Sequence, residues 1–410
     1  MELFEIFSTI IVISAIFTFL NQKTLKMPTT INLMIAGLIL SVIVQIVGAS
    51  SPGFYEMVIR HLEVINFSEF LLEILLSFLL FAGALHTDLE KLKASKWPIL
   101  SFATIGVIIS TFLSGAGLYY LLVLFEQPID FIYCLLFGAL ISPTDPIAVL
   151  GIMKKANAPK SLEIKITGES LFNDGVGVVI FLTILEIARK GMGNVDALDI
   201  GQLFAVEVFG GVILGLLLGY IGLKAMKSID HYKTEVLITL AVVMGGYALA
   251  SAIHVSGPLA MVMAGLLIGN VGKESAMSKI TLDYVNKFWE MIDEILNAIL
   301  FVLIGLELVL IPFNLYFVII GLVSMLLLIV GRYISLAFPS YLLGFKKTFE
   351  PNSLRIMTWG GLKGGISIAL ALSLDTGTEK DLILAVTYTV VLLSLIVQGL
   401  TFESVIRKWT

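Results

Sequence analysis

GALISPTDPIAVLGI, residues 138–152, interrupts an apolar run with two prolines that flank a threonine and an aspartate. Each proline removes a backbone N–H donor, and its ring collides with the preceding turn of a helix. We therefore expect a helix through this run to unwind between Pro143 and Pro146. Unwinding leaves Asp145 beside free N–H and C=O groups, which carry the partial charges of helix ends. Free carbonyls at such a break can also ligate a small cation.

Composition indicates that lipid surrounds this run. The chain has 410 residues, of which 58% are apolar and 14% charged, and its mean hydropathy is +1.00. Soluble domains are about 25% charged, so a soluble core could not hide this much apolar surface. The net charge of −5 lies almost wholly in short loops, and a single cysteine, Cys134, excludes an internal disulfide framework.

Thirteen apolar runs approach the roughly 20 residues that a transmembrane helix needs. They lie near residues 4–20, 29–48, 70–86, 98–125, 131–151, 162–188, 202–226, 234–253, 257–271, 290–310, 314–338, 352–374 and 380–402. Loops after odd-numbered spans hold most of the lysines, whereas loops after even-numbered spans hold only Arg60, Arg189, Lys190 and Lys380. Under the positive-inside rule, this alternation predicts an all-α polytopic protein of the cell inner (plasma) membrane, with its N-terminus outside and its C-terminus cytoplasmic.

A second interruption occurs in WGGLKGGISIAL, residues 359–370, where four glycines surround Lys363. Each glycine costs about 1 kcal/mol in a helix interior, so we expect this span to break as well. The broken spans are the fifth and the twelfth, which makes spans one to six and eight to thirteen two candidate inverted repeats. Matched interruptions in two halves point to a transporter binding site near the membrane midplane. We expect Asp145 to settle near N-terminal half-helix ends and Lys363 near C-terminal ones.

The sixth span carries a polar stripe in ITGESLFNDGVGVVIFL, residues 166–182. Ser170 and Asp174 lie one turn apart on a helix, and Glu169 and Asn173 form the adjacent ridge, all within about 140° of arc. The stripe offers hard oxygen ligands without a thiol or an imidazole. Such sites suit Na⁺, Li⁺, K⁺ or Mg²⁺ and disfavour soft transition metals.

Two of these acids have different expected roles. A charge at the centre of a membrane helix costs about 2.5–3.5 kcal/mol on insertion scales, so each acid needs a partner or a task. For Glu169 we expect a salt bridge to Arg332 or to Lys363, two basic residues at membrane depth. Asp174 stands one turn beyond the hydroxyl of Ser170 and opposite the predicted breaks. We interpret it as a carboxylate with a functional role, not only a structural one.

Several of these segments resemble one known family. GESLFNDGVGVV, residues 168–179, closely resembles the sixth-span motif of NhaP-type sodium/proton antiporters in the first cation:proton antiporter family. SPTDPIAV, residues 142–149, resembles the family's unwound fifth span, and WGGLKGGISIAL resembles a further family segment. The similarity runs from the second span to the thirteenth, essentially the whole chain.

The resemblance implies one membrane transporter domain over residues 1–410 that forms a homodimer. Its mobile core would comprise roughly 98–188 and 314–402, built around the crossing of the broken helices, and its dimerisation part roughly 1–97 and 202–310. Since the chain stops just beyond the last span, we expect no soluble C-terminal domain.

The resemblance also implies a set of site residues. The Na⁺ and proton site would use Asp174, Ser170, Asp145 and Thr144, the last through its backbone. Asn173 would steady the unwound backbone, and Glu169 would pair with a basic residue of a later span.

Two departures from the family pattern stand out in this sequence. Ala82 occupies a position where several relatives carry a glutamate ligand, which leaves the choice among Na⁺, Li⁺ and K⁺ open. Lys363 replaces the arginine of many relatives and keeps the charge but not the bidentate fork. We therefore favour Arg332 as the main partner of Glu169.

The residues and the resemblance together predict an antiporter in which Na⁺, or alternatively Li⁺, competes with H⁺ for Asp174. With one titrating carboxylate in the sixth span, we expect electroneutral one-for-one exchange that serves pH homeostasis. A K⁺/H⁺ antiporter is the main alternative, and a cation channel is a weaker one. The sequence holds no phosphate-binding loop or zinc motif, so we expect no enzyme, no cofactor and no nucleic-acid partner.

Overall fold

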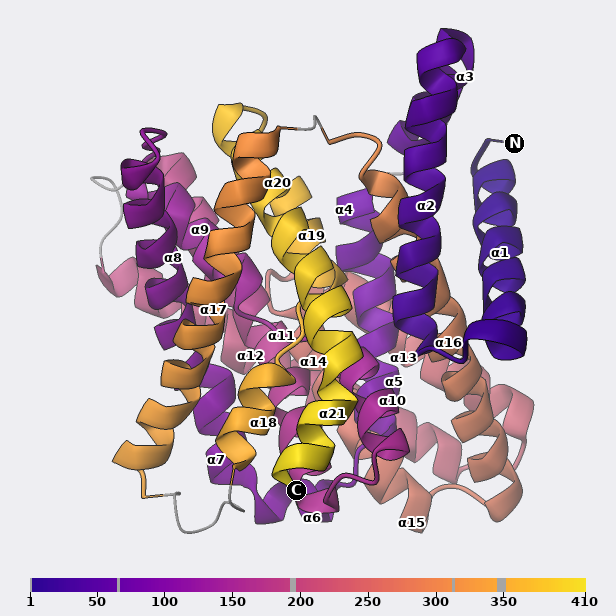
Figure 1. The fold of residues 1–410 in the computed structure, drawn as a ribbon. Helices are drawn as coiled ribbons and strands as arrows, with labels where there is room; N and C mark the ends of the chain where they lie inside the picture. Colours follow the sequence, from indigo (N-terminus) through magenta and orange to yellow (C-terminus); the bar gives the residue numbers. More distant parts are fainter. Residues whose placement is uncertain (1, 65–66, 192–196, 312–313, 345–351) are drawn as a thin grey trace.

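A computed structural model describes residues 2–64, 67–191, 197–311, 314–344 and 352–410, and every regular element in these ranges is a helix (Figure 1). The elements of the first third of the chain, in which η marks a π-helical segment, are α1 (Glu2–Leu20), η1 (Asn21–Leu25), α2 (Thr29–Ser50), α3 (Pro52–Val64), α4 (Phe67–Glu69), η2 (Phe70–Leu75), α5 (Leu76–His86), α6 (Leu89–Ala94), α7 (Lys96–Ser101), η3 (Phe102–Gly106), α8 (Val107–Leu124), α9 (Phe131–Ile141) and α10 (Pro146–Lys155). The remaining elements are α11 (Lys160–Lys190), α12 (Ala197–Lys227), α13 (Tyr232–Ala252), α14 (Gly257–Leu267), η4 (Ile268–Gly272), α15 (Lys273–Ser275), α16 (Lys279–Glu307), α17 (Leu315–Leu342), α18 (Ser353–Trp359), α19 (Gly365–Leu372), α20 (Thr378–Leu393), η6 (Ser394–Gln398) and α21 (Gly399–Trp409).

The described residues include nine helical stretches that are long and apolar enough to cross a membrane. Two shorter apolar helices, Phe131–Ile141 and Gly257–Gly272, stand between them. The chain is therefore an all-α, multi-pass membrane protein, as the sequence predicts. The count of thirteen crossings and the inverted repeats stay predictions.

Both predicted breaks are present at mid-height of the molecule. The fifth span divides into α9 and α10 around residues 142–145, and the twelfth divides into α18 and α19 around residues 360–364. In Figure 1, α9 and α19 lie in the upper half, and α10 and α18 lie in the lower half. The backbone N–H of Asp145 donates to the carbonyl of Leu362 over 2.8 Å, so the two unwound segments are bonded to each other.

Two helices differ from the bounds expected from hydropathy. Residues 52–64, expected as loop, form α3, which begins with Pro52 in its first turn, where a missing N–H is tolerated. The helix α16 begins at Lys279, eleven residues before the predicted span, because the Ser278 side chain accepts from the Thr281 N–H and caps it. Hydropathy misses both segments because each is amphipathic.

Glycines allow the backbones of α2 and α16 to touch. A Cβ on Gly37 would lie 2.7 Å from the carbonyl oxygen of Val302 and 2.8 Å from the Cα of Gly305. No side chain could move aside there, since the obstacle is backbone. In lipid, packing of this kind holds helices together in place of the hydrophobic effect.

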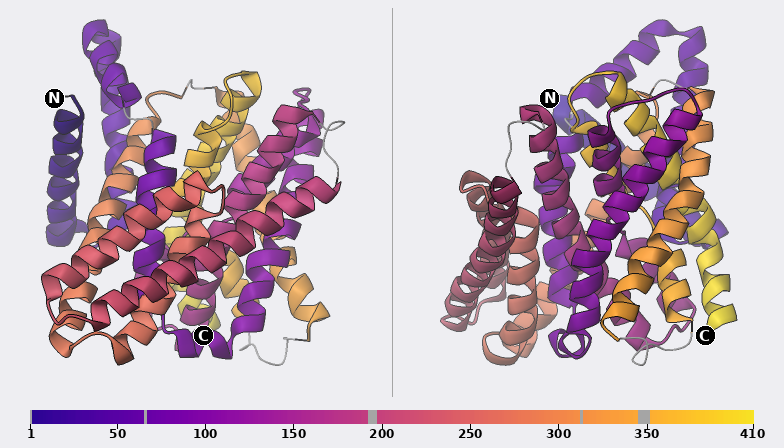
Figure 2. Two further views of the ribbon diagram at one scale, coloured as in Figure 1. Left: turned by 180° about the vertical axis from the view of Figure 1, so that it is seen from behind. Right: turned by 90° about the vertical axis from the view of Figure 1, so that its left-hand side faces the viewer.

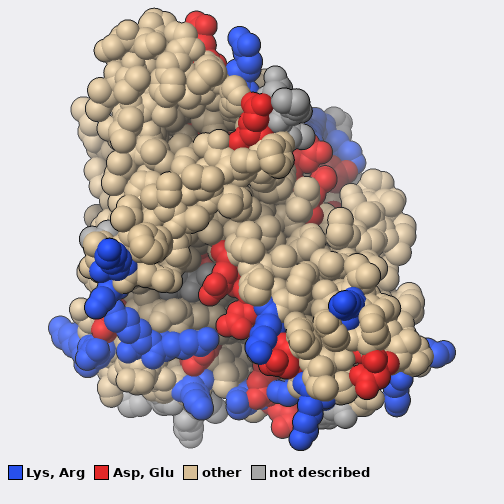
Figure 3. All heavy atoms as spheres, turned by 90° about the vertical axis from the view of Figure 1, so that its right-hand side faces the viewer, with Lys and Arg blue, Asp and Glu red and all other residues tan. Residues whose placement is uncertain are grey.

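The termini lie at opposite ends of the molecule, the N-terminus above and the C-terminus below (Figure 2). Lysine and arginine side chains gather at the lower end, and acidic side chains lie within a hollow of the same face (Figure 3).

Candidate functional site

The unbroken helix α11 presents the predicted polar stripe to the two breaks. Glycines bring its backbone close to its neighbours: a Cβ on Gly177 would collide with the ring of Pro143, and one on Gly175 would lie 2.6 Å from the Leu259 side chain. Glu169, Ser170, Asn173 and Asp174 are all buried. The sequence thus places four polar side chains where α11 meets the unwound fifth span.

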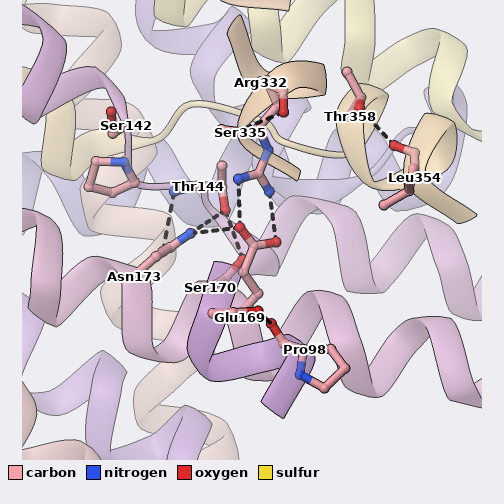
Figure 4. A network of polar contacts seen from close by, with 12 residues as sticks. Pro98, Ser142, Thr144, Glu169, Ser170, Asn173, Arg332, Ser335, Leu354 and Thr358 are labelled. Carbon is pink, nitrogen blue, oxygen red and sulfur yellow. Dashed lines mark hydrogen bonds and ion pairs between the residues drawn. The ribbon is translucent and has the colours of Figure 1, made fainter. Parts of the chain in front are cut away.

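A hydrogen-bonded cluster joins α11 to the first break (Figure 4). The amide of Asn173 donates from Nδ2 to Oγ1 of Thr144 over 2.9 Å, and its Oδ1 accepts from the Thr144 N–H over 3.5 Å. The hydroxyls of Thr144 and Ser170 are 3.0 Å apart. Asn173 therefore holds both the backbone and the side chain of Thr144, and the hydroxyl of Thr144 takes part as well as its backbone.

Glu169 pairs with Arg332 of α17 in a bidentate ion pair (Figure 4). The two guanidinium nitrogens lie 2.5 Å and 2.7 Å from the two carboxylate oxygens. Their side chains are only 7% and 1% exposed. Oε1 of Glu169 also accepts from Nδ2 of Asn173 over 3.5 Å, which links this pair to the cluster around Thr144. Of the two basic partners weighed from the sequence, the structure gives Glu169 the arginine.

Lys363 has a different partner. Its Nζ donates to the carbonyls of Ser142 and Pro143 over 3.2 Å and 3.3 Å, and its backbone N–H donates to Oγ of Ser394. The carbonyls belong to the open C-terminal end of α9, where a positive charge is favourable. The lysine of one break therefore caps the half-helix of the other.

Asp174 lines a large cavity. The cavity has a volume of about 1430 Å³ and is also lined by Asp145 and Thr144, whereas Ser170 does not line it and contacts the hydroxyl of Thr144. Asp174 is 5% exposed, and its Oδ1 has no hydrogen-bond partner in the part of the chain that the structure describes. A buried carboxylate oxygen without a hydrogen bond is costly unless it binds a proton or a cation.

The cavity leads to the lysine-rich end of the molecule. Lys26, Asp88, Lys154 and Glu403, which stand near the lower end, line it together with the three site residues above. The site is thus accessible from the end at which the C-terminus lies. Asp88 caps α6 by accepting from the Lys91 N–H, and its hydrogen bonds to Lys91 lower the pKa of its carboxyl.

Sequence reasoning did not single out three polar residues of α16. Asp293 and Asn297 line the cavity, and Glu307 is buried farther along the helix. A helical stripe could have found them, because Asp293, Asn297, Leu300, Ile304 and Glu307 fall within about 80° of arc. Hydropathy conceals this stripe, since its polar members stand at both ends of an apolar run. Ala82, by contrast, is buried and does not line the cavity.

Comparisons with known proteins identify the family and the fold. Residues 10–408 match the family model described as "Sodium/hydrogen exchanger, transmembrane". The chain is 49% identical to the Na⁺/H⁺ antiporter NhaP of Pseudomonas aeruginosa, over 98% of this chain and 96% of that protein. It is 34% identical to the Na⁺/H⁺ antiporter NhaH of Halobacillus dabanensis, over 94% and 93% of the two chains. The fold matches the sodium proton antiporter MjNhaP1 from Methanocaldococcus jannaschii with a TM-score of 0.77 over 100% of this chain and 99% of that chain, at 21% identity.

Proposed function

The chain belongs to the sodium/hydrogen exchanger family, and we propose that it is a secondary antiporter that moves Na⁺ in exchange for H⁺. The observation that carries this proposal is the buried Asp174, which lines the cavity and whose Oδ1 has no donor among the described residues. Relatives that match nearly the whole chain are named Na⁺/H⁺ antiporters, which favours Na⁺ over K⁺.

Competition at one carboxylate couples the two ions in this proposal. Asp174 binds either a proton or the cation, and Asp145 and Thr144 supply further oxygen ligands of the kind that hard cations prefer. Arrival of Na⁺ therefore displaces the proton. An empty, charged aspartate at a helix centre costs about 2.5–3.5 kcal/mol, so the unloaded form resists crossing and a leak is suppressed.

The crossing step is assigned to a rocking movement of two parts of the chain. Residues 98–188 and 314–402 would form the mobile core, and residues 1–97 and 202–310 the dimerisation part of a homodimer. The backbone bond from Asp145 to Leu362 supports this division, because it ties the two broken spans into one unit.

The positive-inside rule assigns the lower end of the molecule to the cytoplasm. Basic residues gather there (Figure 3), and the C-terminus lies at the same end (Figure 2). The N-terminus would then lie outside the plasma membrane, and the cavity would open toward the cytoplasm.

A transport assay tests the sodium assignment. In proteoliposomes that hold a pH gradient, we expect Na⁺ or Li⁺ to dissipate the gradient rapidly and K⁺ to do so much more slowly. An equal response to K⁺ would reassign the protein as a K⁺/H⁺ antiporter. Cation flux that continues without any opposing proton movement would instead indicate a channel.

The rate of Na⁺/H⁺ exchange is expected to be independent of the membrane voltage. Position 173 is asparagine, and Glu169 is held by Arg332, so the polar stripe of α11 at the breaks offers one exchangeable charge, Asp174. The protein then carries one positive ion across the membrane in each direction, Na⁺ one way and H⁺ the other. A net elementary charge would couple to voltage by about 2.3 kcal/mol per 100 mV. We therefore expect equal sodium-driven proton fluxes at zero and at about −100 mV, clamped with valinomycin and potassium; a several-fold difference would assign a second proton to Asp145.

A further inference from the structure

The helix α16 brings polar groups to the cavity that the mechanism above does not use. Asp293 and Asn297 line the cavity one helical turn apart, on a different element from the carboxylates of the two site helices. Beyond them on the same stripe, Leu300 and Ile304 pack against Gly365 at the start of α19. The polar pair therefore lies on the cavity side of an apolar contact between α16 and the second break.

The amide of Asn297 is bonded to its own helix on one side only. Its Nδ2 donates to the backbone carbonyl of Asp293 over 2.8 Å. Asn297 is 5% exposed, and this oxygen has no hydrogen-bond partner among the described residues. A buried acceptor that stays unsatisfied costs about 1–3 kcal/mol. The arrangement therefore suits a ligand that the oxygen can reach within the cavity.

Asp293 supplies a charge one helical turn before Asn297. It is half-buried and lines the same cavity as Asp145. Two carboxylates that line one partly dry cavity raise the cost of each other's charged form, and a cation bound in the cavity offsets this cost. Glu290 and Glu294 occupy the same helix and line the same cavity, but both are exposed.

We propose that Asp293 and Asn297 of α16 form a second cation site, which takes up a hard monovalent cation from the cavity and delivers it toward Asp174. Carboxylate and amide oxygens are donors of the class that such cations prefer. The site rests on the proposed function, since it supplies the same cation to the same carboxylate. It sets the concentration at which the cavity loads, whereas Asp174 carries the ion across.

A general attraction of cations by the acidic cavity is the competing explanation. Attraction of that kind depends on net charge, falls with ionic strength, and involves every acid of the wall alike. A neutral amide oxygen contributes to a built site but adds nothing to net charge. Asn297 therefore separates the two explanations.

The test uses four single variants of the full-length protein in proteoliposomes. Asp293→Asn and Asn297→Leu remove the proposed ligands, and Glu290→Gln and Glu294→Gln are matched controls on the same helix. We expect the first two to raise the KM for Na⁺ about tenfold, comparable to losing a hydrogen bond to a charged group, with kcat unchanged. The controls should keep the wild-type KM at high ionic strength.

Two outcomes would overturn the second site. One is an unchanged KM in folded Asn297→Leu, and the other is an equal rise in KM in Glu290→Gln and Asp293→Asn that vanishes with added salt. If Asp293→Asn does not fold, as judged by its melting curve, Asn297→Leu decides alone.

Sodium titration calorimetry separates this proposal from that for Asp174. We expect Asp174→Asn to retain weak sodium binding that the added Asp293→Asn change removes. If Asp174→Asn still exchanges ions, the role proposed for Asp174 fails, and the calorimetric comparison still reports on the second site. If the double variant binds sodium as well as Asp174→Asn does, the second site is wrong while the proposed function stands.

Discussion

Asp174→Asn is expected to reduce Na⁺/H⁺ exchange below about one tenth of the wild-type rate, a loss of more than about 1.4 kcal/mol. The amide keeps the size of the side chain but neither binds a proton exchangeably nor neutralises a cation. Since Oδ1 of Asp174 has no partner among the described residues, the replacement breaks no hydrogen bond at that oxygen. We therefore expect the purified variant to melt at or above the wild-type temperature.

Asp375→Asn is the matched control for this change. Asp375 does not line the cavity. It bonds Arg189 at 2.8 Å on the surface, where both side chains are largely exposed, and the guanidinium lowers the pKa of its carboxyl. Exposed pairs contribute about 0–1 kcal/mol, so exchange and melting should stay near wild type. Exchange by Asp174→Asn above about one tenth of wild type would remove Asp174 from the proposed role.

The sequence predicts the parts of the site that depend on local chemistry. Prolines at 143 and 146 and the glycines around Lys363 disfavour a helix wherever they stand, so both breaks could be placed before the structure was known. The stripe on α11 follows from helix periodicity alone. Charges at membrane depth identify the residues that need partners.

Long-range pairing could not be predicted in the same way. Glu169 faced two basic candidates, and the sequence favoured Arg332 only because a lysine lacks the bidentate fork; helix periodicity does not show which of the two faces the carboxylate. The choice follows from packing, because the open carbonyls at the end of α9 take the lysine and leave the bidentate guanidinium for the carboxylate. The role proposed for Asn297 could not be predicted for a related reason. The sequence shows an asparagine in an amphipathic stretch, but only the packing of the helix against the cavity shows that its side-chain oxygen lacks a hydrogen-bond donor among the described residues.

Glu169→Gln is expected to destabilise the protein by about 3–5 kcal/mol, the usual effect of removing one partner of a buried ion pair. The guanidinium of Arg332 would remain in a space where its side chain is 7% exposed, with no carboxylate opposite it. The effect should appear as a lower melting temperature of the purified protein. Exchange by the fraction that stays folded should persist, because Glu169 does not line the cavity.

A paired replacement tests the cause of this loss. Glu169→Leu with Arg332→Met removes both charges, and replacing a buried pair by apolar groups of similar volume is often neutral or stabilising. The double variant should therefore melt well above Glu169→Gln. It should not fully restore transport, because Glu169 also accepts from Asn173, which holds Thr144 at the first break. If Glu169→Gln melts like wild type but no longer binds sodium, Glu169 belongs to the ion site, and its pairing with Arg332 is a feature of the empty site rather than a support of the fold.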